Sequence, residues 1–197
     1  MKIKAWEIAA AAAVLLFVLC LAAVNEQAAL SEKLIRLHVV AHSDALEDQA
    51  LKLKVRDAVL ETAGQATAGA KDAKEAEARL TAGLAEIEAA GKKAAAAEGY
   101  DYNITASLGR ERFTARDYDT FSLPAGEYTT LRVVIGEGQG RNWWCVCFPP
   151  LCTQTVTEWK KTGLDERQTA FITGGGGAVR AEFYTLTLLE KIKEAFD

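Results

Sequence analysis

The period of apolar and polar positions changes several times along the chain, and the most informative change lies between Ile35 and Leu60. The run from Ile35 to Val40 is rich in β-branched and large apolar residues, which is typical of a buried strand. After a polar turn, apolar residues recur at helical spacing, and charged residues take the other directions. This spacing (Leu51, Val55, Ala58, Val59) predicts an amphipathic helix with one apolar and one charged face.

The turn predicts how this helix begins. Asp44 is followed three residues later by Glu47, which is the spacing of a capping box. In that motif the side-chain oxygen of the first residue accepts from unpaired backbone N–H groups of the first helical turn. We therefore expect Asp44 to be the N-cap.

The middle of the chain predicts a second helix and then several strands. Apolar residues at helical spacing predict one amphipathic helix over 72–97 (Ala76, Leu80, Leu84, Ile87). From Tyr100 the period becomes two, which predicts strands around Ile104 and over 113–121. Two more strands, 128–135 and 143–148, are joined by a glycine-rich loop, so we expect a hairpin.

The last part of the chain shows weaker patterns. We expect a short helix over 157–161, a loop over 174–177, an alternating stretch over 179–183 and an amphipathic helix over 186–196. The segregation of helices and strands predicts an α+β fold, with a mainly antiparallel sheet covered by two to three amphipathic helices. We expect residues 30–197 to form a single domain after an N-terminal membrane or signal helix.

The N-terminus determines the compartment. Lys2 and Lys4 precede Ile8–Val24, a run of 17 uncharged apolar or small residues. As a helix this run rises about 25 Å, against a hydrocarbon core of roughly 30 Å. The run is either an uncleaved anchor or a signal peptide. We favour the anchor, because no clean A-x-A cleavage site is present. The two lysines predict that this end stays in the cytoplasm and that residues 30–197 are exported. Cys20 lies inside the run.

The net charge limits the classes of binding partner that we expect. The net charge is -4, and without Lys2, Lys4 and Glu7 it is -5. Nothing in this composition favours nucleic acid, and an acidic exported part does not favour binding to anionic lipid. We therefore expect membrane contact only through residues 8–24, and we expect no cofactor.

Three of the four cysteines lie close together in Asn142–Cys152. In an exported protein such cysteines more often form disulfides than react. A strand turned back by Pro149 and Pro150 favours a Cys145–Cys152 bridge, with Cys147 free and buried. Sequence does not separate the three pairings, and all three thiols staying reduced is the remaining alternative.

Two chemical alternatives use the only histidines, His38 and His42. In the first, a Cys145 thiolate with one histidine as base and Asp44 as orienting group would make a hydrolase or transferase of the cell envelope. No local signature of such an enzyme is present, and we expect no catalytic residues. In the second, the histidines would bind a metal, but four residues along a strand span about 13 Å, too far for one ion.

The glycine-rich loop invites a nucleotide-binding hypothesis. Its glycines, Gly136, Gly138 and Gly140, are spaced GxGxG, and no helix follows them. A dinucleotide site needs such a loop to open a helix whose N-terminus meets the phosphates. We therefore expect a connecting loop.

A partner-binding surface is the interpretation that we favour. Trp143 and Trp144 are adjacent on a strand, so they point to opposite faces and one can meet a partner. Aromatic and arginine side chains are common anchors of protein interfaces. The candidate partner-binding residues are His38, His42, Ser43, Asp44, Asp48, Lys52, Lys54, Arg56, Arg132, Arg141, Asn142, Trp143 and Trp144.

Two blocks together resemble the stage II sporulation protein R family of endospore-forming bacteria. The first is IRLHVVAHSD followed by DQALKLKVRDAV, and the second is PAGEYTTLRVVIGEGQGRNWWCVCFPPLC. The closing VRAEFYTLTLLEKI adds to the likeness. This chain departs from the family pattern at His42, where Asn is more usual, and at Cys147, where an aliphatic residue is more usual. Catalytic or metal-binding roles for these two residues are therefore less well supported.

The resemblance implies a secreted signalling protein made in the forespore and exported into the space between the two sporulation membranes. There it is expected to activate a membrane-embedded aspartyl protease of the mother cell, which then processes the pro-form of the mother-cell sigma factor. Two alternatives remain: the envelope enzyme described above, and a structural envelope protein held by its anchor.

Overall fold

The computed structural model describes residues 4–151 and 163–174. Cys152 and the elements expected over 157–161, 179–183 and 186–196 lie outside these described residues. The chain divides into two compact units. Met1–Leu30, Arg112–Gly126 and Leu164–Asp197 form one unit, and Ser31–Glu111 with Glu127–Gly163 form the other. The second unit contains all thirteen candidate partner-binding residues.

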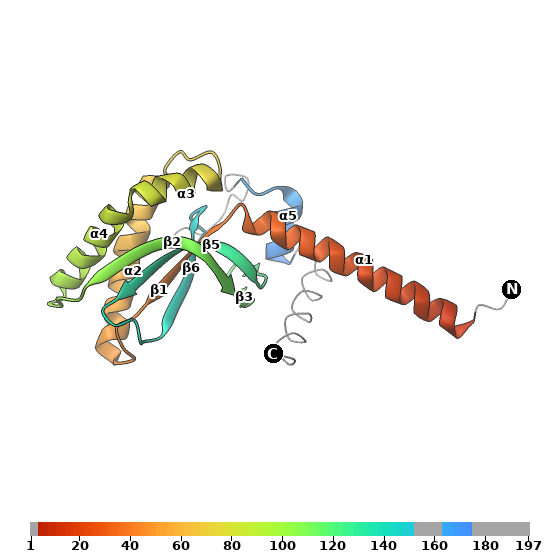
Figure 1. The fold of residues 1–197 in the computed structure, drawn as a ribbon, viewed down its shortest axis with the longest axis horizontal. Coiled ribbons are helices and arrows are strands. Elements are labelled where there is room, and N and C mark those ends of the chain that lie inside the picture. The colour runs from red at the N-terminus through yellow and green to blue at the C-terminus, as the bar shows by residue number, and fades with distance from the viewer. Residues whose placement is uncertain (1–3, 152–162, 175–197) are drawn as a thin grey trace. The chain divides into compact units, whose positions relative to one another are not determined.

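A four-stranded sheet is the centre of the second unit (Figure 1). Its strands, in spatial order, are β2 (Ile104–Phe113), β5 (Gly126–Ile135), β1 (Ile35–Val40) and β6 (Asn142–Phe148). β1 pairs in parallel with β5 and antiparallel with β6, so the sheet is mixed. The predicted α+β class is confirmed.

The predicted hairpin of β5 and β6 is wrong, because β1 lies between these two strands. All six residues of β1 are buried. A nearly continuous apolar run that is buried on both faces is typical of an interior strand, and β1 is paired on both edges. The glycine-rich loop from β5 to β6 thus crosses the end of β1.

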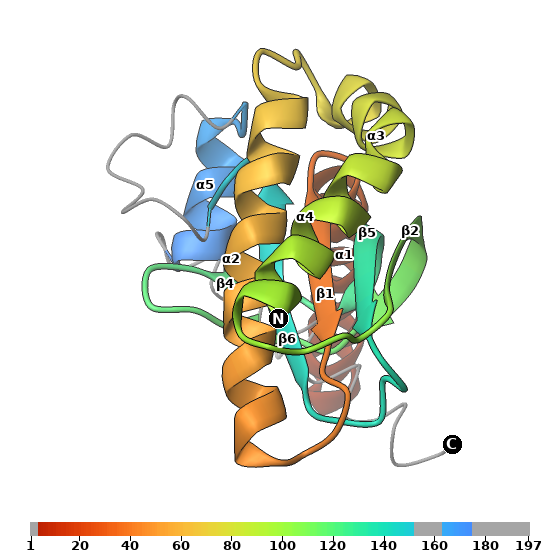
Figure 2. The ribbon, with the colours of Figure 1, turned by 90° about the vertical axis from the view of Figure 1, so that its left-hand side faces the viewer.

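Three helices cover one face of this sheet (Figure 2): α2 (Leu46–Thr67), α3 (Ala73–Ala82) and α4 (Leu84–Ala97). The helix expected over 72–97 is in fact two, divided at Gly83. Asp72 caps α3 by accepting a hydrogen bond from the Glu75 N–H at 2.8 Å. The apolar residues of the helices and of one sheet face form the core (Leu51, Val55, Val59, Leu80, Ile87, Leu37, Val39, Leu131, Val133).

The first unit contains α1 (Ala5–Ser31, whose last residue is assigned to the second unit), β3 (Arg116–Asp117), β4 (Ser122–Leu123) and α5 (Glu166–Thr173). The strand expected over 113–121 is wrong, because the chain turns there into the short antiparallel pair β3–β4. In that turn the Tyr118 N–H donates to the Phe121 carbonyl at 2.8 Å. Sequence periodicity also missed α5, which begins with a capping box at Asp165.

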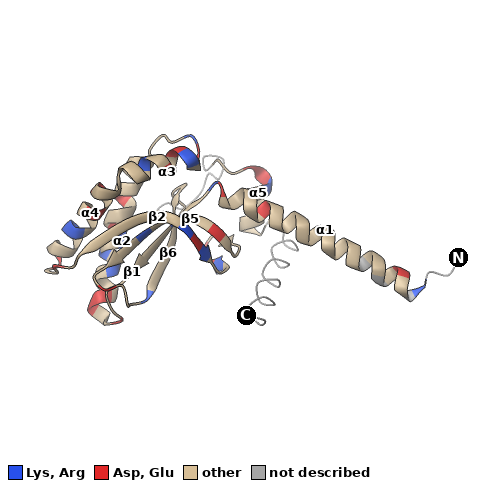
Figure 3. Cartoon of the chain, in the orientation of Figure 1, with Lys and Arg blue, Asp and Glu red and all other residues tan. Residues whose placement is uncertain are grey.

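The long helix α1 is, by length and composition, able to cross a membrane from Trp6 to Ser31. Signal sequences pass the same test. Figure 3 shows that α1 carries few charged residues, whereas α2, α3 and α4 carry many of both signs. The predicted N-terminal apolar helix is present, and it is consistent with a signal sequence or an anchor.

Candidate functional site

Two segments that are far apart in sequence are joined by hydrogen bonds at one end of the sheet. We name them together the loop junction: residues 41–44, which follow β1, and residues 136–141, which connect β5 to β6. Gly140 N–H donates to the Ala41 carbonyl at 3.0 Å, and Gln139 N–H donates to the His42 carbonyl at 3.1 Å. Insertion of β1 between β5 and β6 places the two segments together.

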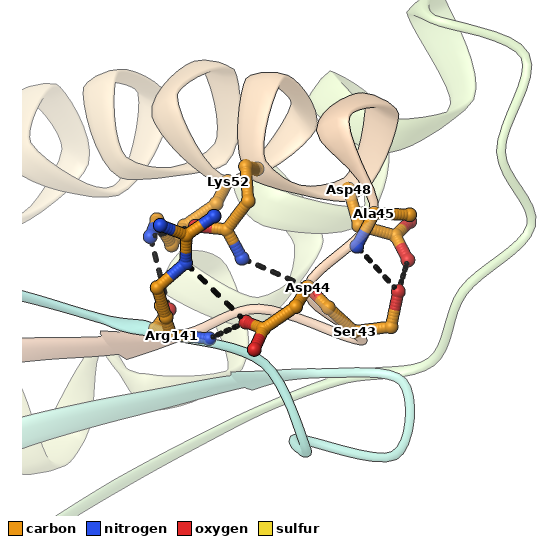
Figure 4. A network of polar contacts seen from close by, with 7 residues as sticks. Ser43, Asp44, Ala45, Asp48, Lys52 and Arg141 are labelled. Atoms are coloured by element: carbon orange, nitrogen blue, oxygen red, sulfur yellow. Dashed lines mark hydrogen bonds and ion pairs between the residues drawn. The ribbon is translucent and has the colours of Figure 1, made fainter.

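Asp44 belongs to this junction and does not cap α2, so the predicted cap is wrong. The N-cap position is Ala45, and Asp44 Oδ1 instead accepts from the Arg141 N–H at 2.7 Å (Figure 4). Ser43 orders the start of the helix: its Oγ accepts from Ala45 N–H at 3.1 Å and donates to Asp48 Oδ2 at 2.5 Å. The carboxylate is used across the junction because the β5–β6 loop presents an amide to it.

The glycine-rich loop does not present free amides. Each backbone N–H from Gly136 to Arg141 donates to an acceptor of the protein. A phosphate-binding loop needs backbone amides that point at the ligand. The amides of residues 136–141 donate to protein acceptors instead, so this loop does not support the nucleotide-binding hypothesis. Gly136 has φ +56°, and Gly140 lies so close to the Ser43 carbonyl that a Cβ would overlap it. These glycines therefore allow the two segments to approach closely.

Lys52 reaches the junction from α2 and is buried, although the helical pattern places it on the charged face. Its ammonium group donates to Gln49 Oε1 at 2.7 Å and to the Arg141 carbonyl at 2.9 Å. Burial lowers the pKa of Lys52, and the neighbouring charge of Arg141 lowers it further. The buried Lys52 side chain thus links α2 to the β5–β6 loop through the Arg141 carbonyl.

His42 lies on the other side of the junction. Its Nδ1 accepts from the Glu137 N–H at 3.0 Å, and its ring stacks on Tyr102 with centroids 4.3 Å apart. Burial raises the pKa of Tyr102, and its hydrogen bond to Asp48 raises it further. Asp48, which is buried, therefore accepts from Ser43 and Tyr102.

Four other candidates form, together with Glu111, a row across all four strands of the sheet. We name Glu111, Arg132, His38, Trp144 and Asn142 the polar row. Glu111 on β2 pairs through Oε2 with His38 Nδ1 at 2.8 Å and through Oε1 with Arg132 at 3.1 Å. His38 Nε2 lies 2.8 Å from Asn142 Oδ1, and its ring stacks on Trp144 at 3.7 Å. His38 is 4% exposed, so these contacts replace water around the imidazole.

Trp143 points to the opposite face of β6 from Trp144, as the sequence predicts. It pairs with Val39, a core residue, and the Arg56 guanidinium lies 4.4 Å above its ring. Trp143 is still 37% exposed. Lys54, also on α2, is exposed. The exposed members of the candidate set therefore lie around the start of α2 and the start of β6.

The cysteines differ in state. Cys145 is disulfide-bonded, whereas Cys147 is a free, buried thiol whose pKa burial raises to about 12. The predicted partner, Cys152, lies outside the described residues, so the Cys145–Cys152 pairing stays a prediction.

The alternative of a cysteine enzyme fails on geometry in this structure. Cys145 pairs with Leu37 and belongs to the core, whereas His38 belongs to the polar row on the other face of the sheet. His42 stacks on Tyr102, and Asp44 accepts from Arg141. The proposed nucleophile, base and orienting group are therefore not assembled.

The histidines also do not share a ligand set. His38 belongs to the polar row and His42 to the loop junction, and each uses ring nitrogens in contacts with protein groups. Within residues 4–151 and 163–174, no three His, Cys, Asp or Glu side chains are grouped to hold a metal ion.

The sequence pattern does not predict the roles of three residues in these networks: Glu111, Gln49 and Tyr102. Each lies in an unremarkable pattern, either a charged strand end, a polar helix position or an alternating strand. Their roles depend on partners from other elements. The two-residue period of a strand assigns Glu111 to one face of β2, but it does not identify His38 and Arg132 as its partners.

The fold and the site define a class: an α+β protein with a membrane-competent N-terminal helix, whose clustered polar residues are engaged with one another in structural contacts. The chain belongs to the stage II sporulation protein R family, whose sequence model matches residues 31–158. This match includes every candidate partner-binding residue, and it begins at the last residue of α1.

Stage II sporulation protein R of Bacillus subtilis (strain 168) is 37% identical to this chain over 131 residues. The alignment covers 65% of this chain and 57% of that protein, so the chain matches little more than half the length of this relative. No solved structure matches the chain.

Proposed function

We propose that this sporulation protein is an exported signalling protein that activates a membrane-embedded aspartyl protease, and that the protease then processes the pro-form of the mother-cell sigma factor. The observation that carries the proposal is the family match over residues 31–158, which contains the loop junction and the polar row. The helix α1 supplies a route to or through the cytoplasmic membrane. The site of action is the intermembrane space of the sporulating cell.

The protein acts by binding and not by catalysis. The arrangement of Cys145, His38 and Asp44 supports this, because the groups that an enzyme would bring together lie apart. A binding activator needs differential affinity: it must bind the active state of the protease more tightly than the inactive one, since equal affinity shifts no equilibrium.

The loop junction, together with exposed Trp143 just beyond its end on β6, is the surface that we propose for this contact. Its segments are cross-linked by backbone hydrogen bonds, and Lys52 holds one of them from the core side. Such a surface is ordered before binding, so little conformational entropy is lost when a partner docks. Arg141 and Asp44 are mostly exposed, with side chains 69% and 63% accessible, and are available to a receptor.

Reconstitution tests the proposal. The full chain, the candidate protease and its pro-sigma substrate are produced together in non-sporulating cells, and cleavage is followed by immunoblot. We expect the pro-form to be cleaved only when all three are present. A protease with its catalytic aspartate replaced serves as the control.

Two outcomes would contradict the proposal. Cleavage that proceeds equally without this chain would remove its activating role, and cleavage that needs this chain but no protease would make the chain an enzyme. A structural envelope protein would leave cleavage unchanged and would not co-purify with the protease.

A further inference from the structure

The helix α1 changes character along its length. Large apolar side chains are exposed from Trp6 to Val24, as expected of a helix that crosses a lipid bilayer (Trp6, Ile8, Val14, Leu15, Leu16, Phe17, Val18, Leu21, Val24). Towards the end of the helix, one face is withdrawn from solvent. Ala23 and Leu30 are fully buried, and Glu26 and Gln27 between them are half-buried.

These four positions lie on one helix face. Their spacing is i, i+3, i+4 and i+7, which is the pattern of a helix packed against a folded body. Half-buried Leu19 and Cys20 extend the same face one turn earlier, whereas Asn25, Ala28 and Ala29 on the other side are exposed. The last part of α1 is therefore packed on one side, unlike its first part.

Two side chains of this packed helix face, Glu26 and Gln27, contact other residues of the first unit. Glu26 Oε2 lies 3.0 Å from Arg167 Nε of α5, and the Glu26 side chain is only 14% exposed. The Gln27 amide lies against Gly126 at the start of β5, so closely that a Cβ there would overlap it. Both partners belong to the same compact unit as α1.

We infer that α1 is retained as a membrane anchor and that residues 23–31 are part of the exported fold. The small residues that could serve a signal peptidase, Ala22–Ala23 and Ala28–Ala29, lie within or beside the packed face. Cleavage after Ala29 would remove Ala23, Glu26 and Gln27 from the unit. The part from Trp6 to Ala22 rises about 25 Å and lies in the bilayer. The protein is tethered, whichever partner it binds.

The first test examines the full chain as cells make it. The chain carries a C-terminal epitope tag and is produced in a sporulating host. We expect an intact mass that includes residue 4 and all of α1, and recovery in the membrane pellet after alkaline carbonate extraction. A mature N-terminus between residues 23 and 31, with release into the supernatant, would overturn the inference.

The second test examines the packed face itself, in the purified full chain in mild detergent. Glu26→Gln and Arg167→Gln each remove one partner of the ion pair, and Glu7→Gln changes an exposed glutamate of the same helix as the matched control. We expect chymotrypsin to cut near Leu30 about fivefold faster in the first two variants, since local opening exposes the bond, and no faster in the control.

The charge-swapped pair Glu26→Arg with Arg167→Glu distinguishes the contact from a general loss of stability. We expect the swap to restore slow cleavage to within about twofold of the unaltered chain, because coupled neighbours compensate one another. Equal cleavage rates in all variants, or a swap that cleaves as fast as the single variants, would show that this face does not hold the helix.

Discussion

At the scale of single residues, burial determines the chemistry of the two ionisable groups that the sequence left ambiguous. Cys147 lies in the core, and Lys52 lies beneath the loop junction. A low-dielectric environment disfavours the charged form of each group, so it raises the pKa of the thiol and lowers the pKa of the amine. The two residues therefore respond to pH in opposite senses.

We predict that Cys147 is nearly inert towards thiol reagents. Burial raises its pKa from an ordinary 9.0 to about 12. The reactive thiolate is therefore about 1000-fold scarcer at pH 8 than in the unfolded chain, before steric protection is added. Alkylation rates in a Cys20→Ala background, native against urea-unfolded, measure this ratio. Native labelling as fast as unfolded labelling would contradict it.

We predict that Lys52 makes the protein more stable as pH rises. Because its folded pKa lies below the ordinary 10.5, the unfolded chain holds a proton that the folded chain has already released. The free energy of unfolding therefore rises with pH in the window below 10.5. Lys52→Met should remove this rise.

Denaturant unfolding between pH 7 and 10 measures the effect, with Lys54→Met, exposed on the same helix, as the control. Cys147 acts in the opposite sense above pH 9, so variants that all retain Cys147 are compared. Identical pH slopes for Lys52→Met and the unaltered chain would refute the prediction.

At the scale of elements, the position of β1 organises the site. Because β1 separates β5 from β6, the loop between them must cross the end of β1, and it meets the turn that leads into α2. The close approach at Gly140 is a consequence of this crossing. The junction depends on strand order more than on any one side chain.

We predict that Gly140→Ala destabilises the protein by about 1–3 kcal/mol, the range for overpacking. The new Cβ would meet the Ser43 carbonyl, which is backbone and cannot turn away. Gly109→Ala on β2 is the matched control, because a Cβ there has nothing within 4 Å. Thermal or denaturant unfolding compares the two variants. Equal stabilities would show that the junction is loose.

At the scale of the whole molecule, exposed apolar side chains mark where a partner could bind. Outside α1, the large hydrophobic residues that are exposed in the described part of the chain are Leu46, Leu53 and Trp143. Leu46 and Leu53 lie seven residues apart on α2, and Arg56 of the same helix covers Trp143. Aromatic and arginine residues of this kind often dominate binding energy.

We predict that Trp143→Ala lowers protease activation about tenfold or more while leaving the amount of folded protein unchanged. Pro-sigma cleavage in the reconstituted system measures activation, and the unfolding midpoint measures stability. Lys93→Ala, exposed on α4, is the control and should behave like the unaltered chain. Full activation by the Trp143 variant would place the contact elsewhere.

The sequence by itself determined the local features of this protein: the apolar N-terminal helix, the β1–α2 unit, most helices and strands, and the two blocks that belong to one family. These follow from periodicity and composition, which act over a few residues. Only the tertiary structure decided that β1 separates β5 from β6, that Asp44 serves the loop and not the helix, and that Lys52 and Glu111 join networks. Strand order and burial depend on contacts between residues about a hundred positions apart. The periodicity of a short segment does not specify which distant residue it will contact.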